Sequence, residues 1–267
     1  MKLPFVKMTG AGNDFVMVDN RALSFPLDKE RIAALCDRRF GIGADGLLAV
    51  EPGAEGADFR MRYYNADGGE AEMCGNGARC FAQYVRHLGA AAGQATSFLT
   101  PAGRIEARYE GEEIQLTLTP PQDWKLSQTL DTPAGPLEVH SVNTGVPHAV
   151  VFVPDVAAVD VATLGAALRR HAAFAPKGTN ANFVQVTGAD SLRVRTFERG
   201  VEGETLACGT GVVASALLAH RLGKVAAPVR VTVEGRAILT VGFQEGYQNV
   251  TLQGPALVVY TGEISWN

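Results

Sequence analysis

The sequence is poor in cysteine, in excess charge and in long apolar runs. Four cysteines in 267 residues are too few for the disulfide framework of a small secreted domain, and they fit a reducing cytoplasm. A net charge of −4 without a stripe of Lys and Arg does not predict a nucleic-acid partner. No apolar run approaches the roughly 18 residues of a membrane span, so no membrane partner is expected.

Several motifs with known chemistry are also missing. Because there is no C-x-x-C and no H-E-x-x-H, no metal site is predicted. The P-loop pattern G-x-x-x-x-G-K-[ST] is absent. None of the six lysines stands in a setting that anchors a cofactor, so we expect no cofactor, pyridoxal phosphate included. The first eight residues carry a lysine inside their apolar stretch and do not resemble a signal peptide, which favours a cytoplasmic location.

One glycine-rich segment, residues 41–46, satisfies G-x-G-x-x-G. The dinucleotide-binding form of this pattern needs a strand before it and a helix after it. The apolar residues here predict a helix before the segment and a strand after it. Dinucleotide binding is therefore not predicted.

What the sequence does contain is one nine-residue pattern twice. Gly-Glu-x-x-x-Cys-Gly-x-Gly spans residues 69–77 and residues 203–211. The two cysteines, Cys74 and Cys208, are 208 − 74 = 134 positions apart, half the length of the chain. Further segments match in order at this offset, among them Leu88-Gly89 with Leu222-Gly223 and residues 59–63 with residues 193–197. The matches indicate an internal duplication, and the chain is long enough for two domains of roughly 130 residues each.

The apolar patterns predict short strands and two helices in each half. The expected strands, which are β-branched or alternating, are residues 15–18, 47–50, 59–63, 114–118, 149–153, 193–197 and 229–233. An outer helix in each half is opened by an aspartate that caps its first turn, and we expect these helices from Asp28 to Phe40 and from Asp160 to His171. An inner helix begins at each cysteine and stops before a glycine. The second inner helix is apolar on most faces, which predicts that its own sheet wraps it.

The domain boundary is expected where Pro120 and Pro121 stop a strand. The last segment is strand-like but follows the second repeat, so we expect it to cross back to the first domain. The predicted fold class is α+β, with two pseudo-symmetric domains from an internal duplication. The first comprises residues 1–119 plus 256–267 and carries Cys74, and the second comprises residues 120–255 and carries Cys208.

A cysteine followed by Gly-x-Gly at a helix start has a defined chemistry. The free N–H groups of the first turn favour an anion such as a substrate carboxylate, and the same field favours thiolate over thiol. Two such thiols facing one cleft suit a two-base proton transfer, in which one takes a proton from carbon and the other returns one on the opposite face. A helix terminus supplies roughly 0.3–1 kcal/mol, less than the ~1.36 kcal/mol of one pKa unit, so the thiols need a further partner. His148 and Glu198 are the candidates, because each lies near a glycine-bearing turn.

Several other residues allow two interpretations. Cys36 and Cys80 lie within predicted helices and are expected in the core. Glu70 and Glu204 either support the loop before each cysteine or take part in catalysis. Two arginines are either solvated or functional, namely Arg79 and Arg199. The remaining histidines are expected at the surface: His87, His140, His171 and His220.

Together these features resemble the diaminopimelate epimerase family over essentially the whole chain. The segments that carry the resemblance are residues 10–15, 41–48, 64–68, 73–80, 147–148, Asn180, 198–200 and 207–211. The resemblance implies two similar domains, each a β-barrel-like mixed sheet around a central helix, with the active site in the cleft between them. It also implies cofactor-independent interconversion of LL- and meso-2,6-diaminopimelate, in lysine and peptidoglycan-precursor biosynthesis, by a homodimer.

The resemblance further assigns roles to single residues. The family's acid/base pair matches Cys74 and Cys208, and the residues that assist it match His148 and Glu198. The groups that hold the reacting carboxylate match Gly75, Asn76, Gly209 and Thr210. Substrate contacts, several of them at the distal amino-acid terminus, match Asn13, Asn65, Asn180 and Arg199. The sequence departs from many members at Val146, which precedes the Pro-His pair, and from some at Gly46.

The nearest alternative is a proline racemase or hydroxyproline 2-epimerase with the same cysteine pair. Those relatives usually have Cys-Gly-His-Gly at the first cysteine and Asp-Arg-Ser-Pro-Cys at the second. Here Asn76 and Leu206-Ala207-Cys208 differ, which disfavours this alternative. A thiol redox protein that cycles a disulfide is a different class and would need a resolving partner.

Overall fold

The structure is a computed structural model of the chain, and it describes residues 2–265. Met1, Trp266 and Asn267, which the predicted first domain includes, lie outside the described residues. The described chain divides into two compact units. Residues 2–116 and 254–265 form unit 1, and residues 117–253 form unit 2. Strands dominate both units and each also has two α-helices within the described residues, which confirms the predicted α+β class.

Unit 1 is a mixed sheet in the order β18-β1-β2-β3-β4-β6-β7-β8. The two-residue strand β5 pairs with the end of β4, beside β6. The strands are β1 (Lys2–Gly10), β2 (Asn13–Asp19), β3 (Gly46–Pro52), β4 (Phe59–Asn65), β5 (Glu70–Ala71), β6 (Ala95–Thr100), β7 (Gly103–Glu110), β8 (Glu113–Thr117) and β18 (Leu257–Ser265).

Unit 2 repeats this arrangement in the order β9-β10-β11-β12-β13-β15-β16-β17, with β14 paired to the end of β13. The strands are β9 (Gln122–Thr132), β10 (Gly135–Asn143), β11 (Pro147–Phe152), β12 (Asn180–Gly188), β13 (Ser191–Glu198), β14 (Gly203–Thr205), β15 (Val229–Val233), β16 (Ile238–Gln244) and β17 (Gln248–Pro255).

The two units have the same pairing pattern, as the duplication predicts. The parallel pairs are β2–β3 and β4–β6 in unit 1, and β11–β12 and β13–β15 in unit 2. The other neighbours named in the two strand orders are antiparallel. β18 pairs with β1 as β9 pairs with β10. Residues 257–265, in the last segment of the chain, therefore belong to the sheet of unit 1.

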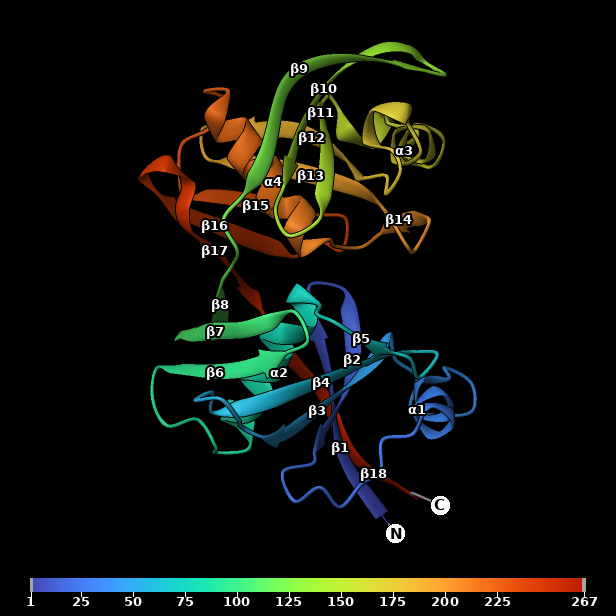
Figure 1. The fold of residues 1–267 in the computed structure, drawn as a ribbon, viewed down its shortest axis with the longest axis vertical. Helices are drawn as coiled ribbons and strands as arrows, with labels where there is room; N and C mark the ends of the chain where they lie inside the picture. The colour runs from blue at the N-terminus through green and yellow to red at the C-terminus, as the bar shows by residue number, and fades with distance from the viewer. Residues whose placement is uncertain (1, 266–267) are drawn as a thin grey trace. The chain divides into compact units, whose positions relative to one another are not determined.

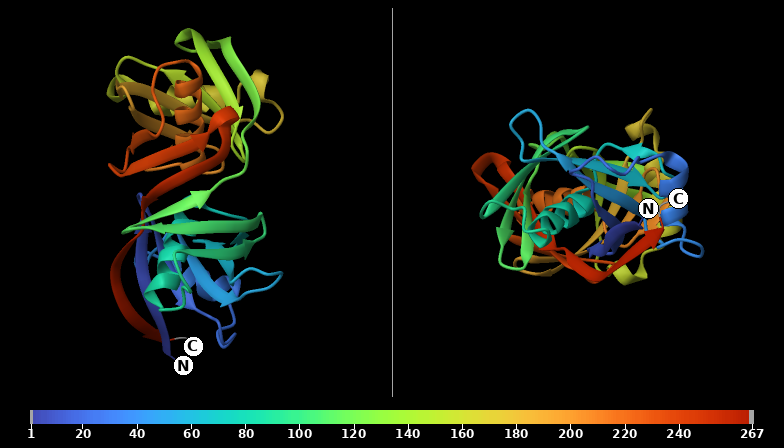
Figure 2. Two further views of the ribbon diagram at one scale, coloured as in Figure 1. Left: turned by 90° about the vertical axis from the view of Figure 1, so that its left-hand side faces the viewer. Right: turned by 90° about the horizontal axis from the view of Figure 1, so that it is seen from below.

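Each inner helix crosses the inside of its own sheet. α2 (Gly75–His87) packs against β1, β2 and β3, and α4 (Gly209–Arg221) packs against β10, β11, β12, β13, β15 and β16. The right-hand view of Figure 2 shows α2, in teal, enclosed by the strands of unit 1. Residues 211–219 of α4 are all buried, so the prediction of a sheet-wrapped helix is confirmed. Gly89 and Gly223 follow the helices with φ of +65° and +69°, the left-handed conformation that ends helices.

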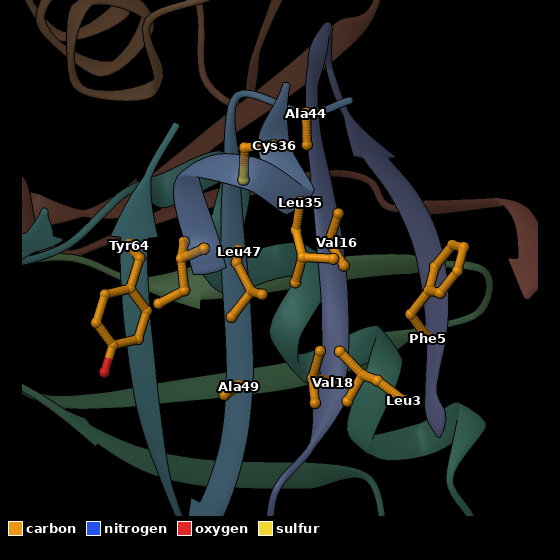
Figure 3. Close-up of a cluster of buried hydrophobic side chains, with 11 residues drawn as sticks. Leu3, Phe5, Val16, Val18, Leu35, Cys36, Ala44, Leu47, Ala49 and Tyr64 are labelled. Atoms are coloured by element: carbon orange, nitrogen blue, oxygen red, sulfur yellow. The ribbon is translucent and has the colours of Figure 1, made fainter. Parts of the chain in front are cut away.

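The outer helices, α1 (Lys29–Cys36) and α3 (Val161–Arg169), cover the opposite faces of the sheets (Figure 1). Successive strand residues point to opposite faces. Val16 and Leu47 therefore pack with Leu35 of α1 in one buried cluster (Figure 3). Their neighbours Phe15 and Leu48 approach α2. The same alternation in unit 2 places Ala149 and Ala181 against α3.

The aspartates that were predicted to open the outer helices do so. Asp28 accepts from the backbone N–H of Arg31, and Asp160 accepts from that of Thr163. α1 ends at Cys36, short of the predicted Phe40, because the carboxylate of Asp37 accepts from the backbone N–H groups of Arg39 and Phe40. These local hydrogen bonds compete with the continuing helix.

Candidate functional site

Cys74 and Cys208 occupy equivalent positions, each one residue before an inner helix. Both have extended backbone conformations, with φ/ψ of −138°/123° and −121°/106°. The carbonyl oxygen of each accepts the first helical hydrogen bond, from Ala78 and from Val212. Neither sulfur caps the helix within the described structure. The N–H groups of the first turn, including those of Gly75 and Gly209, have no acceptor inside their helices and are suited to bind an anion.

In unit 1 a chain of hydrogen bonds passes through the first turn of α2. Nη2 of Arg79 donates to Oδ1 of Asn76 at 2.7 Å. Nδ2 of Asn76 donates to Oδ1 of Asn13 at 2.7 Å, and Nδ2 of Asn13 donates to Oδ2 of Asp45 at 2.9 Å. Each side chain donates to the next, from the cation of Arg79 to the carboxylate of Asp45. The chain fixes the orientation of Asn76 and Asn13, two of the residues predicted to bind substrate.

Arg79 is fully buried. Of the two interpretations of this residue, the solvated side chain is therefore excluded. Within residues 2–265, Nε and Nη1 of Arg79 have no hydrogen-bond partner. Burial lowers the pKa of this guanidinium, whereas the negative charges of ionised Cys80 and Cys74 raise it. The equivalent position in unit 2, 79 + 134 = 213, holds Val213, so this buried cation is a feature of unit 1 alone.

Asp45 lies in a charged cluster that sequence reasoning missed. Arg38 pairs with Asp14 at 2.6 Å and with Asp45 at 2.9 Å, and the buried Lys7 pairs with Asp14 at 2.8 Å. Lys7 also donates to the carbonyl oxygen of Gly43. The hydrogen bonds to Arg38 and Lys7 outweigh the effect of burial and lower the pKa of Asp14 to about 2. The cluster holds Gly43 and Asp45 of the segment 41–46. This structural role accounts for the glycine-rich segment without a bound nucleotide.

Within residues 2–265, the side chain of Asn65 does not take part in the hydrogen-bond chain from Arg79 to Asp45. Its backbone closes a turn, in which its N–H donates to Gly69 and its carbonyl oxygen accepts from Gly68. It lies opposite Gly46 in the β3–β4 register. A Cβ atom on Gly46 would lie 2.3 Å from the carbonyl oxygen of Tyr64, so a larger residue does not fit this backbone.

In unit 2 the equivalent position in the first helical turn is Thr210, and it contacts His148. Nε2 of His148 lies 2.9 Å from Oγ1 of Thr210, and that hydroxyl lies 3.6 Å from Sγ of Cys208. The backbone carbonyl oxygen of Thr210 accepts from Thr144 at 2.9 Å. Three predicted site residues, His148, Thr210 and Cys208, therefore form one cluster.

Asn180 and Arg199 are brought together by the backbone. The N–H of Arg199 donates to Oδ1 of Asn180 at 2.8 Å, and Nδ2 of Asn180 donates to Pro147 at 3.3 Å. Asn180 lies beside His148 in the parallel β11–β12 register. Arg199 is partly exposed, and its guanidinium donates to the carbonyl oxygen of Lys177 at 3.4 Å. Asn180 thus ties together the strand ends that carry His148 and Arg199.

Glu198 ends β13 and is partly buried. Its Oε2 accepts from the hydroxyl of Thr205 at 3.0 Å, three residues before Cys208. Burial raises the pKa of Glu198, and the hydrogen bond from Thr205 opposes this shift. A carboxyl group whose pKa is raised in this way is suited to carry or exchange a proton.

Acid is expected to destabilise the protein through His148. Burial, helped by the positive charge of Arg199, lowers the pKa of His148 from 6.5 to about 3. Between these values the unfolded chain binds a proton that the folded protein does not. The free energy of unfolding should therefore fall as the pH decreases from about 6.5 toward about 3, by up to about 1.4 kcal/mol per pH unit. Urea unfolding at several pH values measures this slope.

The control for this prediction is His148→Gln, which removes the titrating ring. Its unfolding free energy should fall less steeply with acid than that of the unmutated protein. Glu198 acts with the opposite sign, since a raised carboxyl pKa in the folded state adds stability as the pH falls, but it is present in both proteins. Equal slopes in the two proteins would contradict a neutral, buried His148.

Other residues with two interpretations are resolved by their contacts. Glu70 pairs with Arg62, and Glu204 pairs with Arg195 at the equivalent place in unit 2, which favours loop support for both glutamates. Cys36 and Cys80 are buried as predicted. Burial raises the pKa values of these two thiols, to about 11 and about 12, so they are poor nucleophiles.

The prediction that the other histidines lie at the surface is wrong for His140. Its ring is buried, lies edge-on to Phe152 and accepts from the backbone N–H of Ser127 at 3.0 Å. His87 is exposed as predicted. His171 and His220 are partly buried.

Within residues 2–265, no group of three or more His, Cys, Asp or Glu side chains is placed to hold a metal ion. No helix among the described residues is long and apolar enough to span a membrane.

Comparison with known proteins gives a consistent result. The family model described as diaminopimelate epimerase matches residues 5–123 and 140–265. A relative named diaminopimelate epimerase from Chlorobaculum tepidum is 46% identical over 261 residues, covering 97% of this chain and 100% of the relative. Another of that name, from Aquifex aeolicus, is 42% identical over 275 residues and covers 98% of each chain.

Solved structures with the same fold have much lower identity. A phenazine biosynthesis protein of the PhzF family from Bacillus anthracis has a TM-score of 0.74 at 17% identity, covering 100% of both chains. A probable proline racemase from Agrobacterium radiobacter has a TM-score of 0.72 at 16% identity, covering 99% of this chain and 93% of that one. At such identities the likeness concerns the fold alone, so it does not favour the proline racemase alternative.

Proposed function

We propose that this chain, which belongs to the diaminopimelate epimerase family, interconverts LL- and meso-2,6-diaminopimelate by two-base proton transfer. The observation that supports the substrate is identity of 46% over nearly the full length to a protein of that name. The matching construction of the two units around Cys74 and Cys208 supports the mechanism. Such an enzyme is an isomerase of lysine and peptidoglycan-precursor biosynthesis.

In the proposed reaction one cysteine thiolate removes the α-proton and becomes a thiol. The electron pair stays on the α-carbon and its carboxylate as a planar carbanion. The other cysteine, initially a thiol, donates its proton to the opposite face and becomes a thiolate. Configuration at that carbon is inverted, and the roles of Cys74 and Cys208 are exchanged for the reverse reaction.

The first turns of α2 and α4 are the proposed binding groups for the reacting carboxylate. Their N–H groups stabilise the negative charge that grows as the proton leaves, and one well-placed donor of this kind accelerates a reaction ~10²–10³-fold. Asn76 and Thr210, whose side chains are fixed by hydrogen bonds, orient the reactants. No metal or organic cofactor takes part in this proposal.

Several of the remaining proposed contacts are with the distal end of the substrate. A second amino-acid terminus offers a carboxylate and an ammonium group, which a guanidinium and amides recognise. Arg199, Asn180 and Asn13 supply such groups, and Asn65 lies at the same end of the sheet as Asn13. His148 and Glu198, both in unit 2, assist the cysteine pair.

Isotope labelling tests the two-base mechanism. In D₂O we expect early product to carry deuterium at the inverted carbon while unreacted substrate stays largely protiated, in both directions. The thiol that donates to the product carries solvent deuterium, whereas a carbanion that reverts to substrate recovers the hydrogen from the thiol that removed it. NMR or mass spectrometry of the two isomers measures this. Equal labelling of substrate and product at early times would mean a single shared base.

Assays on L-proline, under reducing conditions, test the alternative substrate.

We also infer a cytoplasmic homodimer, as the family resemblance implies. A reducing cytoplasm protects the proposed reacting thiols of Cys74 and Cys208 from oxidation. For the dimer, β18 presents consecutive exposed apolar side chains of the kind that subunit contacts cover: Leu257, Val258, Val259 and Tyr260.

A further inference from the structure

Asn182 is a fully buried polar residue that the proposed mechanism has not used. It lies on the face of β12 that points to α4, and three hydrogen bonds hold its amide. Nδ2 donates to the carbonyl oxygen of Ala149 at 2.9 Å and contacts Nδ1 of His148 at 3.2 Å. Oδ1 accepts from the hydroxyl of Thr196 at 2.9 Å. A carbonyl oxygen can only accept, so the contact with Ala149 fixes which end of the amide carries the N–H groups.

This orientation determines where the proton of His148 sits. An amide nitrogen can only donate, so Nδ1 of His148 must accept and carries no hydrogen. Burial keeps the ring neutral, with a pKa of about 3, so its one hydrogen is on Nε2. Nε2 then donates to Oγ1 of Thr210 at 2.9 Å. The hydroxyl hydrogen of Thr210 is left to point at Sγ of Cys208, 3.6 Å away.

We propose that Asn182 is a positioning residue that aims this relay of hydrogen bonds at the sulfur of Cys208. A donor stabilises the negatively charged thiolate more than the neutral thiol. Asn182 therefore favours the form of Cys208 that accepts a proton, although it touches neither the sulfur nor the substrate. The inference rests on the proposed function in one respect, which is that Cys208 is a reacting group.

The equivalent chain in unit 1 is built differently. It begins at the cation of Arg79 and ends at the carboxylate of Asp45, through the amides of Asn76 and Asn13. The duplicated thiols are thus supported by unlike neighbours, a fixed charge in unit 1 and an oriented neutral ring in unit 2. The repeat of the nine-residue pattern does not reveal this difference.

Gly211 leaves the space that the amide of Asn182 fills. A Cβ atom at this position would lie 2.3 Å from Oδ1 of Asn182, far inside contact distance. At the equivalent Gly77 of unit 1 the nearest atom to such a Cβ is Cδ1 of Leu48, at 3.3 Å. Alanine at 211 must therefore displace Asn182, whereas alanine at 77 needs only a small adjustment.

The tautomer of His148 can be read without any variant of Asn182. Nitrogen-15 NMR of protein labelled at its five histidines distinguishes the two tautomers, and the His148→Gln spectrum assigns the signal. At pH 7 we expect a neutral ring with its hydrogen on Nε2. A hydrogen on Nδ1, or a doubly protonated ring, overturns the proposal.

Asn182→Asp keeps the size of the side chain but replaces the donor with an acceptor. We expect the ring hydrogen to move to Nδ1, so that Nε2 accepts from Thr210 and the hydroxyl turns away from Cys208. Alkylation of Cys208 by iodoacetamide, quantified by mass spectrometry of the Cys208 peptide, should then shift to higher pH by about one unit or more. Cys74, read in the same sample, should keep its profile. Epimerisation should slow about tenfold in kcat, with KM within about twofold.

Two other variants test the same relay. Asn182→Leu removes the donor, and Gly211→Ala displaces it, so both should shift Cys208 alkylation in the direction expected for Asn182→Asp. Gly77→Ala is the matched control and should leave the Cys208 profile unchanged. An unchanged profile in both Asn182→Asp and Asn182→Leu overturns the proposal.

These readouts separate the inference from the proposed function. The tautomer and the alkylation profile are measured without substrate, so they hold even if the unmutated protein does not turn over diaminopimelate. Conversely, normal epimerisation together with an Nδ1–H tautomer would reject the role of Asn182 and leave the proposed function intact.

Discussion

Alanine in place of either Cys74 or Cys208 is expected to lower epimerisation by at least about 10³-fold. In the proposed reaction each cysteine is the only group that transfers a proton on its side of the carbon, and a positioned acid or base contributes about 10²–10⁴-fold. The loss should appear equally in both directions, because each thiol is the base in one direction and the acid in the other. Initial rates of LL- to meso-diaminopimelate conversion, and of the reverse, measure the effect.

The fold should survive both substitutions. Neither sulfur caps its helix within the described residues, so the stability that a capping side chain provides is not lost. Cys36→Ala is the matched control, because this thiol is buried in α1 and its pKa is raised to about 11. Its rate should stay within about twofold of the unmutated protein. A Cys74→Ala or Cys208→Ala protein that retains a tenth of the rate would show that its thiol is not an obligatory acid or base.

Much of the architecture was predictable because both copies of the duplication keep the same short local sequence motifs. Cys-Gly-x-Gly marked both inner helix starts, and the glycines after Leu88 and Leu222 marked both helix ends. These features depend on backbone geometry within one turn, so they need no knowledge of tertiary contacts. The end of α1 was predicted wrongly, because the hydrogen bonds of Asp37 to the following N–H groups compete with helix and leave no apolar signal.

The parts of the site that depend on pairing across the sheet were harder to predict. Asn182 is separated from His148 by 34 positions, and its role follows from the parallel register of β11 and β12. The one signal for Asn182 in the sequence was the alternation Asn180-Ala181-Asn182. Ala181 packs against α3, so Asn182, the next residue, is a polar residue on the opposite, inner face of the strand. Likewise, helical spacing placed Arg79 on α2, but its burial depends on which faces of α2 the sheet covers.

The buried charge of Arg79 is expected to have opposite effects on stability and on catalysis. It is fully buried, and two of its three nitrogens lack a hydrogen-bond partner among residues 2–265. Burying a charge without full pairing is unfavourable. In the proposed mechanism the same charge is useful, because it holds Asn76 in place and is attracted to ionised Cys74. The residue is therefore expected to serve function at the expense of stability.

Arg79→Met is expected to raise the free energy of unfolding by about 1–2 kcal/mol, since well-packed apolar side chains replace buried charges at no loss or with a gain. It should also lower kcat/KM for LL-diaminopimelate about 10²-fold, through loss of the charge and of the fixed amide of Asn76. Urea unfolding and initial rates measure the two effects on the same protein preparation.

Arg86→Met is the matched control, because it makes the same substitution two turns further along α2. Arg86 is partly exposed, donates to the carbonyl oxygen of Gly111 at 2.8 Å and lies over the ring of Tyr109. Its loss should reduce stability slightly, by about 0.5–1 kcal/mol, and leave kcat/KM within about twofold. If Arg79→Met were instead less stable than the unmutated protein and equally active, the buried guanidinium would be a structural element of the core with no part in the reaction.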